Sequence, residues 1–247
     1  MDILGVISCL LNYPSEQVFE NEAEIIDIID ASELSLEQKA KLEAFVTQNL
    51  GKDIMDWQAE YDGLFERGRS LGLWLFEHVH GESRDRGQAM VDLVQIYREA
   101  GLEISQHELP DYIPLFLEFL STQGKENAQG WLQDVEHILG LLQCRLEKRG
   151  SDYAVLFEAL LALAGSDIEL DEIRDQIAEE KRDDTKQAID KEWEEEEVTF
   201  GSESLDKACD TATRRPSETQ RRDLDIPINW VDFDANPSEQ ANRAEGM

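Results

Sequence analysis

Apolar residues recur along most of this chain at intervals of three and four, which is the spacing of helices that bury one face. No stretch alternates between apolar and polar residues with hairpin turns, as exposed strands would. The pattern predicts an all-α fold, a compact single-domain helical bundle over residues 1–165. The expected helices span about residues 3–11, 15–29, 35–50, 53–65, 86–100, 115–120, 128–149 and 151–165, with a short apolar segment at 71–79.

Residues that suit helix termini stand at the ends of these stretches. Ser35 and Gln38 have the spacing of a capping box, and Asp53 can cap the helix that follows it. Pro114 suits a first helical turn, because the N–H that proline lacks would have no partner there. Gly165 follows the last strongly periodic stretch and predicts its end. These signals support the helical interpretation.

The character of the chain changes after Gly165. Residues 166–197 contain 15 acidic and 5 basic residues, a local net charge of −10, while a few isoleucines keep a thin apolar face. We therefore predict an acidic, helical extension over residues 166–200. Residues 201–247 are polar, contain prolines and have no periodicity, and they are predicted to form a mobile, disordered tail.

The charge of the chain restricts its partners. It carries 55 acidic and 23 basic residues, a formal net charge of −32. This balance disfavours nucleic acid, whose phosphates need clustered Lys and Arg, and it argues against docking on anionic lipid. It fits a partner that carries positive charge, because complementary fields steer association. The alternative is that the acidity serves only solubility.

The cysteines and the apolar runs indicate a soluble chain in a reducing compartment. Cys9, Cys144 and Cys209 are far apart in sequence, and the first two lie in apolar helical patterns that are typical of buried free thiols. The N-terminus lacks the basic region of a signal peptide. The longest apolar runs, such as residues 159–164, are too short to span a bilayer. We expect a cytoplasmic protein.

The densest group of chemically active side chains lies in residues 76–88. His78 and His80 are two residues apart, so they could share a metal only if the segment is extended, and no cysteine lies nearby. His80 and Glu82 match the H-x-E of zinc deaminases, but the required P-C-x-x-C is absent. General acid–base catalysis by His78, His80 and Glu82 is open, although no second catalytic motif supports it.

The competing interpretation of this segment is structural or partner-binding. Glu82, Arg84, Asp85 and Arg86 can pair with one another or with helix ends, and would then hold a sharp turn between helices at Gly81. A second segment, Pro110-Asp111-Tyr112, precedes an apolar helix and reads either as a rigid loop or as the wall of a groove. The aromatic residues can form core or line such a groove; they are Trp57, Tyr61, Phe65, Trp74 and Phe76.

Residues 75–93 resemble the signature of the NarJ family of nitrate reductase assembly chaperones. This segment reads Leu-Phe-Glu-His-Val-His-Gly-Glu-Ser-Arg-Asp-Arg-Gly-Gln-Ala-Met-Val-Asp-Leu. The resemblance extends over about residues 2–200, and shorter segments support it at residues 61–69, 108–112, 153–154, 183–185 and 193–196.

The resemblance implies an all-helical cytoplasmic chaperone that is not an enzyme and binds no cofactor stably. It implies binding to the apo catalytic subunit of nitrate reductase, NarG, including its N-terminal segment. Binding would hold that subunit open for insertion of iron–sulfur clusters and the molybdenum cofactor, and would delay its docking to the membrane partner. In the wider group the proline motif usually reads Pro-Asp-His, whereas Tyr112 stands here at the third position, so a role for that imidazole does not carry over.

From chemistry and resemblance together, we expect an apolar groove for an amphipathic helix of the client, with an acidic surface around it. No catalytic and no metal residues are expected. The alternatives are an enzyme that uses His78, His80 and Glu82, and a generic acidic scaffold. The expected partner-binding residues are Tyr61, Phe65, Arg67, Trp74, Phe76, His78, His80, Glu82, Arg84, Asp85, Arg86, Pro110, Asp111 and Tyr112.

Overall fold

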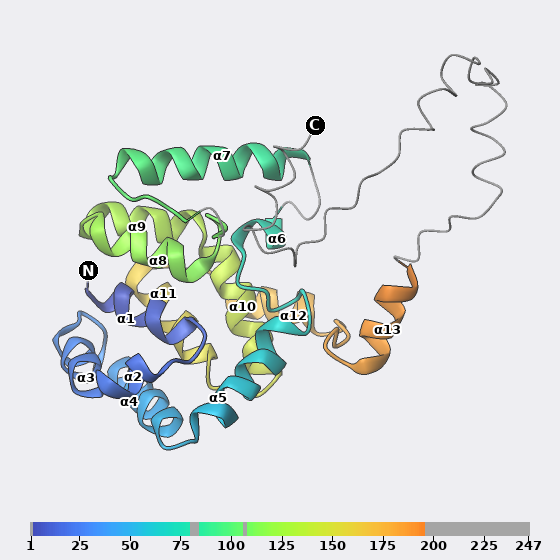
Figure 1. The fold of residues 1–247 in the computed structure, drawn as a ribbon, viewed down its shortest axis with the longest axis horizontal. Helices are drawn as coiled ribbons and strands as arrows, with labels where there is room; N and C mark the ends of the chain where they lie inside the picture. The colour runs from blue at the N-terminus through green and yellow to red at the C-terminus, as the bar shows by residue number, and fades with distance from the viewer. Residues whose placement is uncertain (1, 80–83, 106–107, 196–247) are drawn as a thin grey trace, which may run out of the picture. The chain divides into compact units, whose positions relative to one another are not determined.

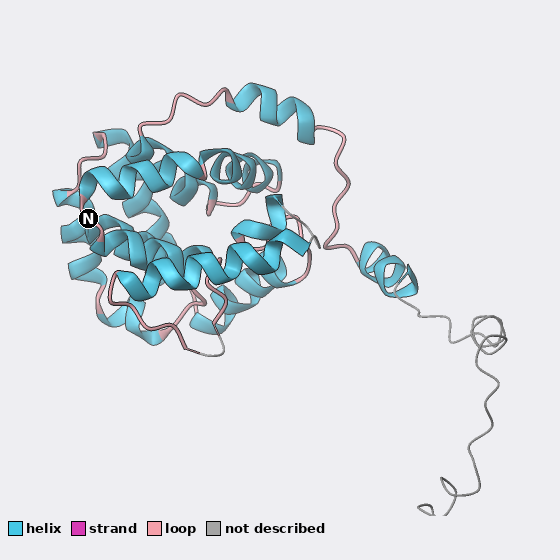
Figure 2. Cartoon of the chain, turned by 90° about the horizontal axis from the view of Figure 1, so that it is seen from above, coloured by secondary structure: helices cyan, strands magenta, loops and turns pink. Residues whose placement is uncertain are grey.

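The computed structural model describes residues 2–79, 84–105 and 108–195, and it confirms the all-α prediction (Figures 1 and 2). Within these ranges the one β-type pairing is a bridge between Trp74 and Tyr112. None of the described helices is long and apolar enough to cross a membrane. The helices are α1 (Asp2–Leu11), α2 (Glu16–Glu20), α3 (Glu22–Ala31), α4 (Leu36–Leu50), α5 (Ile54–Tyr61), the π-helix η1 (Asp62–Glu66), α6 (Leu75–Val79), α7 (Arg84–Glu99), α8 (Ile113–Thr122), α9 (Lys125–Asp134), α10 (Glu136–Lys148), α11 (Ala154–Ala164), α12 (Leu170–Ile177) and α13 (Lys186–Glu195).

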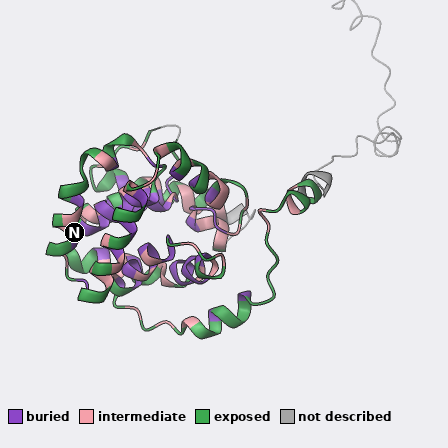
Figure 3. Ribbon diagram, turned by 90° about the horizontal axis from the view of Figure 1, so that it is seen from below, coloured by how far each residue is buried: buried purple, intermediate pink, exposed green. Residues whose placement is uncertain are grey.

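Helix α1 lies in the centre of the core, packed along α8 and also against α3 and α11. Seven of its ten residues are buried, which the spacing of its apolar side chains predicts. Ser8 is the polar exception, and its hydroxyl donates a 2.7 Å hydrogen bond to the carbonyl of Pro114. Figure 3 shows buried residues on the inward faces of the helices and exposed residues on the outward faces.

The predicted helix ends are largely confirmed. The Ser35–Gln38 capping box is present in both directions, and the Asp53 carboxylate accepts a 2.8 Å hydrogen bond from the Met55 N–H. Pro114 occupies the first turn of α8. Gly165 ends α11 with φ of 64°, a left-handed conformation that glycine adopts at little cost.

Two predicted helices are each divided in the structure. The helix expected over residues 128–149 is wrong as one element, because Val135 leaves helical geometry (φ −109°, ψ 6°) and separates α9 from α10. The helix expected over residues 15–29 is likewise divided at Asn21 into α2 and α3. Apolar spacing continues across both breaks, so periodicity could not reveal them.

The acidic extension packs on the bundle through α12. Its Ile173 and Ile177 are buried against Cys144 of α10 and form a second small apolar cluster. Gly140 permits this approach, since a Cβ there would lie 3.1 Å from the side chain of Ile173. The ammonium of Lys148 donates to three carbonyls at the C-terminal end of α12, those of residues 177, 178 and 180. Helix C-termini favour a cation in this way.

Beyond α12, a cluster of ion pairs fastens the chain to the loop that precedes α6. The Asp183 carboxylate accepts hydrogen bonds of 2.7 Å from both the N–H and the hydroxyl of Ser70. Arg149, which directly follows α10, donates to Asp183 at 2.6 Å and lies 3.3 Å from Asp184. Arg145 forms two bonds to Glu180 and a third to the Ser70 carbonyl. We call these residues the Arg149 cluster.

We predict that the Arg149 cluster stabilises the fold much more than an exposed ion pair does. The side chain of Arg149 is 9% exposed and that of Arg174 is 46% exposed. Breaking a buried pair leaves charges without compensation, so Arg149→Met should lower the free energy of unfolding by about 3–5 kcal/mol. Arg174→Met, the matched control, should cost about 0–1 kcal/mol. Urea denaturation of both variants measures this, and equal losses would contradict it.

Candidate functional site

The two segments that carry the expected site lie side by side in the structure. Leu75 and Asp111, which are 36 positions apart in sequence, are hydrogen-bonded to each other. The Leu75 N–H donates to the Asp111 carbonyl at 2.9 Å, and the Ile113 N–H donates to the Leu73 carbonyl at 2.8 Å. These bonds make the bridge between Trp74 and Tyr112, whose rings lie 6.0 Å apart. We call residues 72–79 with residues 110–113 the corner.

Asp111 is the buried centre of the corner. Its side chain is fully buried, and one carboxylate oxygen accepts a 3.2 Å hydrogen bond from the Phe76 N–H. That same oxygen lies 3.8 Å from the guanidinium of Arg86, which also lies 3.7 Å from Glu77. Burial raises the pKa of the Asp111 carboxyl, and the Phe76 N–H and the Arg86 charge offset only part of this rise. The other oxygen has no hydrogen-bond partner among the described residues.

Glu77 stands beside this carboxylate and shares its cation. Burial raises the pKa of Glu77, the charge of Arg86 lowers it, and the negative charge of Asp111 raises it further. Arg86 thus connects the first turn of α7 to both acids of the corner. Arg84 and Asp85 begin α7, but their side chains lie outside the described part of the structure.

Tyr112 connects the corner to the C-terminal end of α1. Its hydroxyl lies 3.3 Å from the Asn12 side-chain oxygen and 3.4 Å from the Tyr61 hydroxyl, which donates to the Leu11 carbonyl at 2.9 Å. Burial raises the pKa of both tyrosines, so neither hydroxyl ionises near neutral pH. The Tyr112 hydroxyl therefore acts here as a neutral hydrogen-bonding group.

His78 fixes the turn before α6. Its Nε2 lies 2.8 Å from the Gly72 carbonyl, and burial lowers the pKa of its imidazole. The neutral ring therefore donates from Nε2 to the carbonyl. His80 and Glu82, the other members of the expected cluster, lie outside the described residues. Among the described residues, no three His, Cys, Asp or Glu side chains are grouped so as to hold a metal.

The expected aromatic residues fall into two groups. Trp57, Tyr61 and Phe65 are at most 2% exposed, and the Trp57 indole donates to the Tyr153 hydroxyl at 2.8 Å. Tyr61 and Phe65 can thus reach a partner only through the residues packed around them. Trp74 and Phe76 are partly exposed at the corner.

Arg67 and Pro110 complete the expected set. The Arg67 side chain is exposed, next to the Arg149 cluster in sequence. Pro110 is buried, and its carbonyl accepts a 2.9 Å hydrogen bond from the Tyr97 hydroxyl of α7. This bond ties the corner to the helix that continues the family signature.

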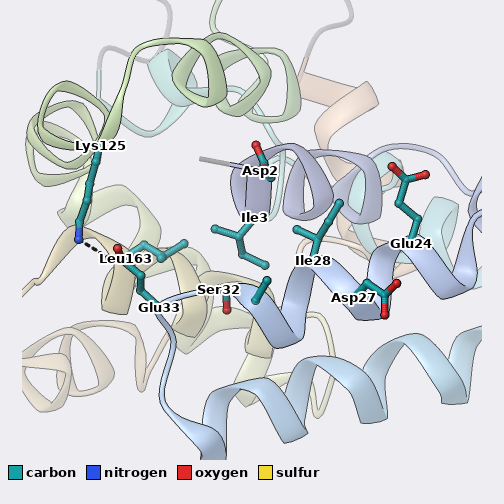
Figure 4. A pocket seen from close by; sticks show the side chains of 10 residues that line it. Asp2, Ile3, Glu24, Asp27, Ile28, Ser32, Glu33, Lys125 and Leu163 are labelled. Atoms are coloured by element: carbon teal, nitrogen blue, oxygen red, sulfur yellow. Dashed lines mark ion pairs between the residues drawn. The ribbon is translucent and has the colours of Figure 1, made fainter.

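Two hollows adjoin α1, and sequence analysis expected neither. One, of about 560 Å³, lies by the corner and is lined by residues that include Asn12 and the half-exposed Tyr13. The other, of about 380 Å³, lies at the opposite end of α1, between α1, α3 and the ends of α9 and α11 (Figure 4). The second is assembled from four helices, two of them distant in sequence, whereas the first is lined mostly by residues 5–17, with Glu118 of α8.

The sequence also did not predict the Arg149 cluster, although residues 183–185, which include two of its carboxylates, belong to the segments that support the family resemblance. The segments 61–69 and 183–185 both support the family resemblance, and the structure brings their ends together through Ser70 and Asp183. A Cβ at Gly68 would lie 2.6 Å from the Asp183 side chain, so a side chain at this position would displace the Asp183 carboxylate.

Comparison with known proteins gives a consistent family. Residues 30–159 match the model of the nitrate reductase delta subunit family. The chain is 47% identical over 207 residues to the nitrate reductase molybdenum cofactor assembly chaperone NarJ of Escherichia coli (strain K12), which covers 83% of this chain and 86% of that relative. It is 43% identical over 236 residues to NarW of the same organism, described as a probable chaperone of the same kind, over 95% of this chain and 98% of the relative.

Two further proteins are less similar to this chain. A probable NarJ chaperone of Bacillus subtilis (strain 168) is 32% identical over 162 residues, covering 64% of this chain and 85% of its own. A solved structure from Archaeoglobus fulgidus, provisionally described as a redox enzyme maturation protein, aligns at TM-score 0.47 and 20% identity over 66% of this chain and 92% of that chain.

We predict that Asp111 makes the stability of the protein fall as pH rises. Because burial raises the folded-state pKa above the usual value of 3.8, the folded protein holds the proton more tightly than the unfolded chain. This contribution is complete below the unfolded-state pKa and is lost as pH rises through the folded-state pKa. Asp111→Asn, which cannot ionise, should therefore gain stability relative to wild type as pH rises above about 4.

Urea denaturation of wild type and Asp111→Asn at a series of pH values between about 4 and 7 measures this difference. Asp56→Asn removes one carboxylate from the exposed face of α5 and controls for the change in net charge. A difference that stays constant with pH, or that moves against the variant as pH rises, would contradict the prediction.

Proposed function

Since the chain belongs to the nitrate reductase delta subunit family of NarJ-type maturation chaperones, we propose that it binds the apo catalytic subunit NarG and holds it ready for insertion of the molybdenum cofactor. The observation that carries this proposal is the 47% identity to an assembly chaperone across 83% of the chain and 86% of that relative. The chain is a chaperone and not an enzyme. Its client contacts, by this proposal, include the N-terminal segment of NarG.

The action we propose is thermodynamic. A protein that binds only the open, unfilled form of a subunit stabilises that form by mass action, to an extent set by its concentration relative to Kd. The client then stays accessible to the iron–sulfur clusters and the molybdenum cofactor, and its docking to the membrane partner is delayed. Closure after insertion removes the bound form and releases the chaperone. This mechanism does not require the chaperone to bind the cofactor stably. Binding of the client, insertion of the cofactor and release of the chaperone all take place in the cytoplasm.

The corner is the proposed contact surface for part of the client. Trp74, Phe76 and Tyr112 present partly exposed aromatic surface there, on backbone held by the bridge and by Asp111. Aromatic side chains on a rigid support make strong anchors for a partner. The hollow lined by Asn12 and Tyr13 adjoins this surface through the contact of Asn12 with Tyr112, and it could take a side chain of the client.

Two alternatives make different predictions. An enzyme that used His78, His80 and Glu82 would show a turnover that His80→Ala abolishes. In the structure, however, His78 has a lowered pKa and is bound to the Gly72 carbonyl, which suits a positioning role better than proton transfer. A generic acidic scaffold would bind many basic helices with similar affinity, without regard to their sequence.

We predict that the protein binds the N-terminal peptide of its cognate NarG by calorimetry and does not bind a scrambled peptide of equal charge. A sequence-specific complex needs apolar anchors in register, which scrambling destroys. Equal binding of the two peptides would favour the generic scaffold. Absence of binding to both would place recognition elsewhere on the client or overturn the proposal.

Salt should weaken this complex. The net charge of −32 attracts a basic peptide, and exposed charges are screened over about 10 Å at 0.1 M ionic strength and about 3 Å at 1 M. The same calorimetric titration in low and high sodium chloride measures the effect. Tighter binding at high salt would show that apolar contacts alone carry the affinity.

A further inference from the structure

We infer that the hollow between α1 and α3 (Figure 4) is an anchor site that takes a large apolar side chain from a basic amphipathic helix of the client. The assignment rests on the proposed binding of the NarG N-terminal segment, and it adds a second contact to the one proposed at the corner. Neither the family resemblance nor the sequence pattern pointed to this hollow.

The floor of the hollow is apolar and is made by three helices. Ile3 of α1, Ile28 of α3 and Leu163 of α11 line it (Figure 4). Ala31, the last residue of α3, is exposed at its edge. A volume of about 380 Å³ lies at the lower end of the range for ligand pockets, and it suits one or two side chains better than a whole molecule.

The rim of the hollow is strongly acidic. It holds four carboxylates and one cation, a net charge of −3, and the cation, Lys125, is already paired with Glu33. Asp2, Glu24 and Asp27 are exposed and form no ion pair among the described residues. An apolar hollow with carboxylates that lack counterions is complementary to an apolar residue flanked by Lys or Arg.

The positions of these charges give the ligand a direction. Glu24 and Asp27 lie one turn apart on α3 and project at one end of the hollow, whereas the Glu33–Lys125 pair lies at the other end (Figure 4). A helix laid across α3 presents side chains three or four residues apart on one face, the same separation as these two carboxylates. The bound segment should therefore carry its cations toward Glu24 and Asp27, one turn from the apolar anchor.

The site lies within reach of the corner. Asp2 and Ile3 begin α1, and Asn12, which contacts Tyr112, directly follows its end. The ten residues of α1 span about 15 Å at a rise of about 1.5 Å per residue. The anchor site and the corner therefore lie at opposite ends of one ten-residue helix.

Two kinds of variant separate the charge from the cavity. Glu24→Gln with Asp27→Asn removes two rim charges at nearly constant size, and its control, Glu172→Gln with Glu179→Gln, removes two exposed charges near α12. Ala31→Trp fills the hollow at constant charge, and its control, Ala44→Trp, places the same ring on the exposed face of α4. All six positions are exposed, and thermal unfolding checks that the four variants fold.

The probes are the cognate NarG N-terminal peptide and a designed helical peptide with leucines and lysines spaced three and four apart, each titrated by calorimetry. We expect Ala31→Trp and the Glu24/Asp27 pair each to weaken binding of the NarG peptide by about tenfold or more, while both controls bind as wild type does. The Glu24/Asp27 variant should also show a smaller dependence on salt.

The outcomes distinguish this inference from the proposed function. If wild type binds the NarG peptide and all variants bind it equally, the anchor site is wrong and the chaperone function stands. If wild type does not bind the NarG peptide, the proposed recognition of the NarG N-terminal segment fails, and the designed peptide then tests the hollow alone. Loss of designed-peptide binding in Ala31→Trp but not in Ala44→Trp would support the anchor site, and equal binding would overturn it.

Discussion

The backbone pairing between residues 73–75 and residues 111–113 is the constraint on which the rest of the functional surface depends. It is formed by two hydrogen bonds, from Leu75 to Asp111 and from Ile113 to Leu73, and it is the one β-type pairing among the described residues. The pairing sets the start of α8, which packs along α1, and it buries Asp111 beneath α6. Loss of this register would displace both Trp74 and Tyr112. It would also break the contact between the corner and the end of α1.

Helix α1 connects the paired segments to the opposite side of the bundle. Its apolar side chains form the centre of the core, and the buried Ser8 hydroxyl ties its middle to the carbonyl of Pro114 in α8. Its C-terminal end meets Tyr61 and Tyr112, and its N-terminal end borders the acid-rimmed hollow. One helix thus borders both proposed client contacts.

The distribution of charge separates the structural from the recognition surfaces. The chain has only 23 basic residues. Three of them, Arg145, Lys148 and Arg149, bind the acidic extension and hold it against the end of α10. There the carboxylates are hydrogen-bonded and partly buried, so they serve the fold. At the rim of the anchor site the carboxylates of Asp2, Glu24 and Asp27 remain exposed, where they are free to attract a basic partner.

The sequence by itself determined the all-helical class, most helix ends and the family, because these depend on local properties: the spacing of apolar residues, caps such as Ser35 and Asp53, and the continuous signature at residues 75–93. It also placed Phe76 and Pro110–Tyr112 among the candidate site residues. Only the tertiary structure decided the helix breaks at Asn21 and Val135, the burial of Tyr61 and Phe65, and the Arg149 cluster. These features arise from contacts between residues far apart in the chain, and the hollow beside α1 is a gap between four helices, which no single helix can encode in its own pattern.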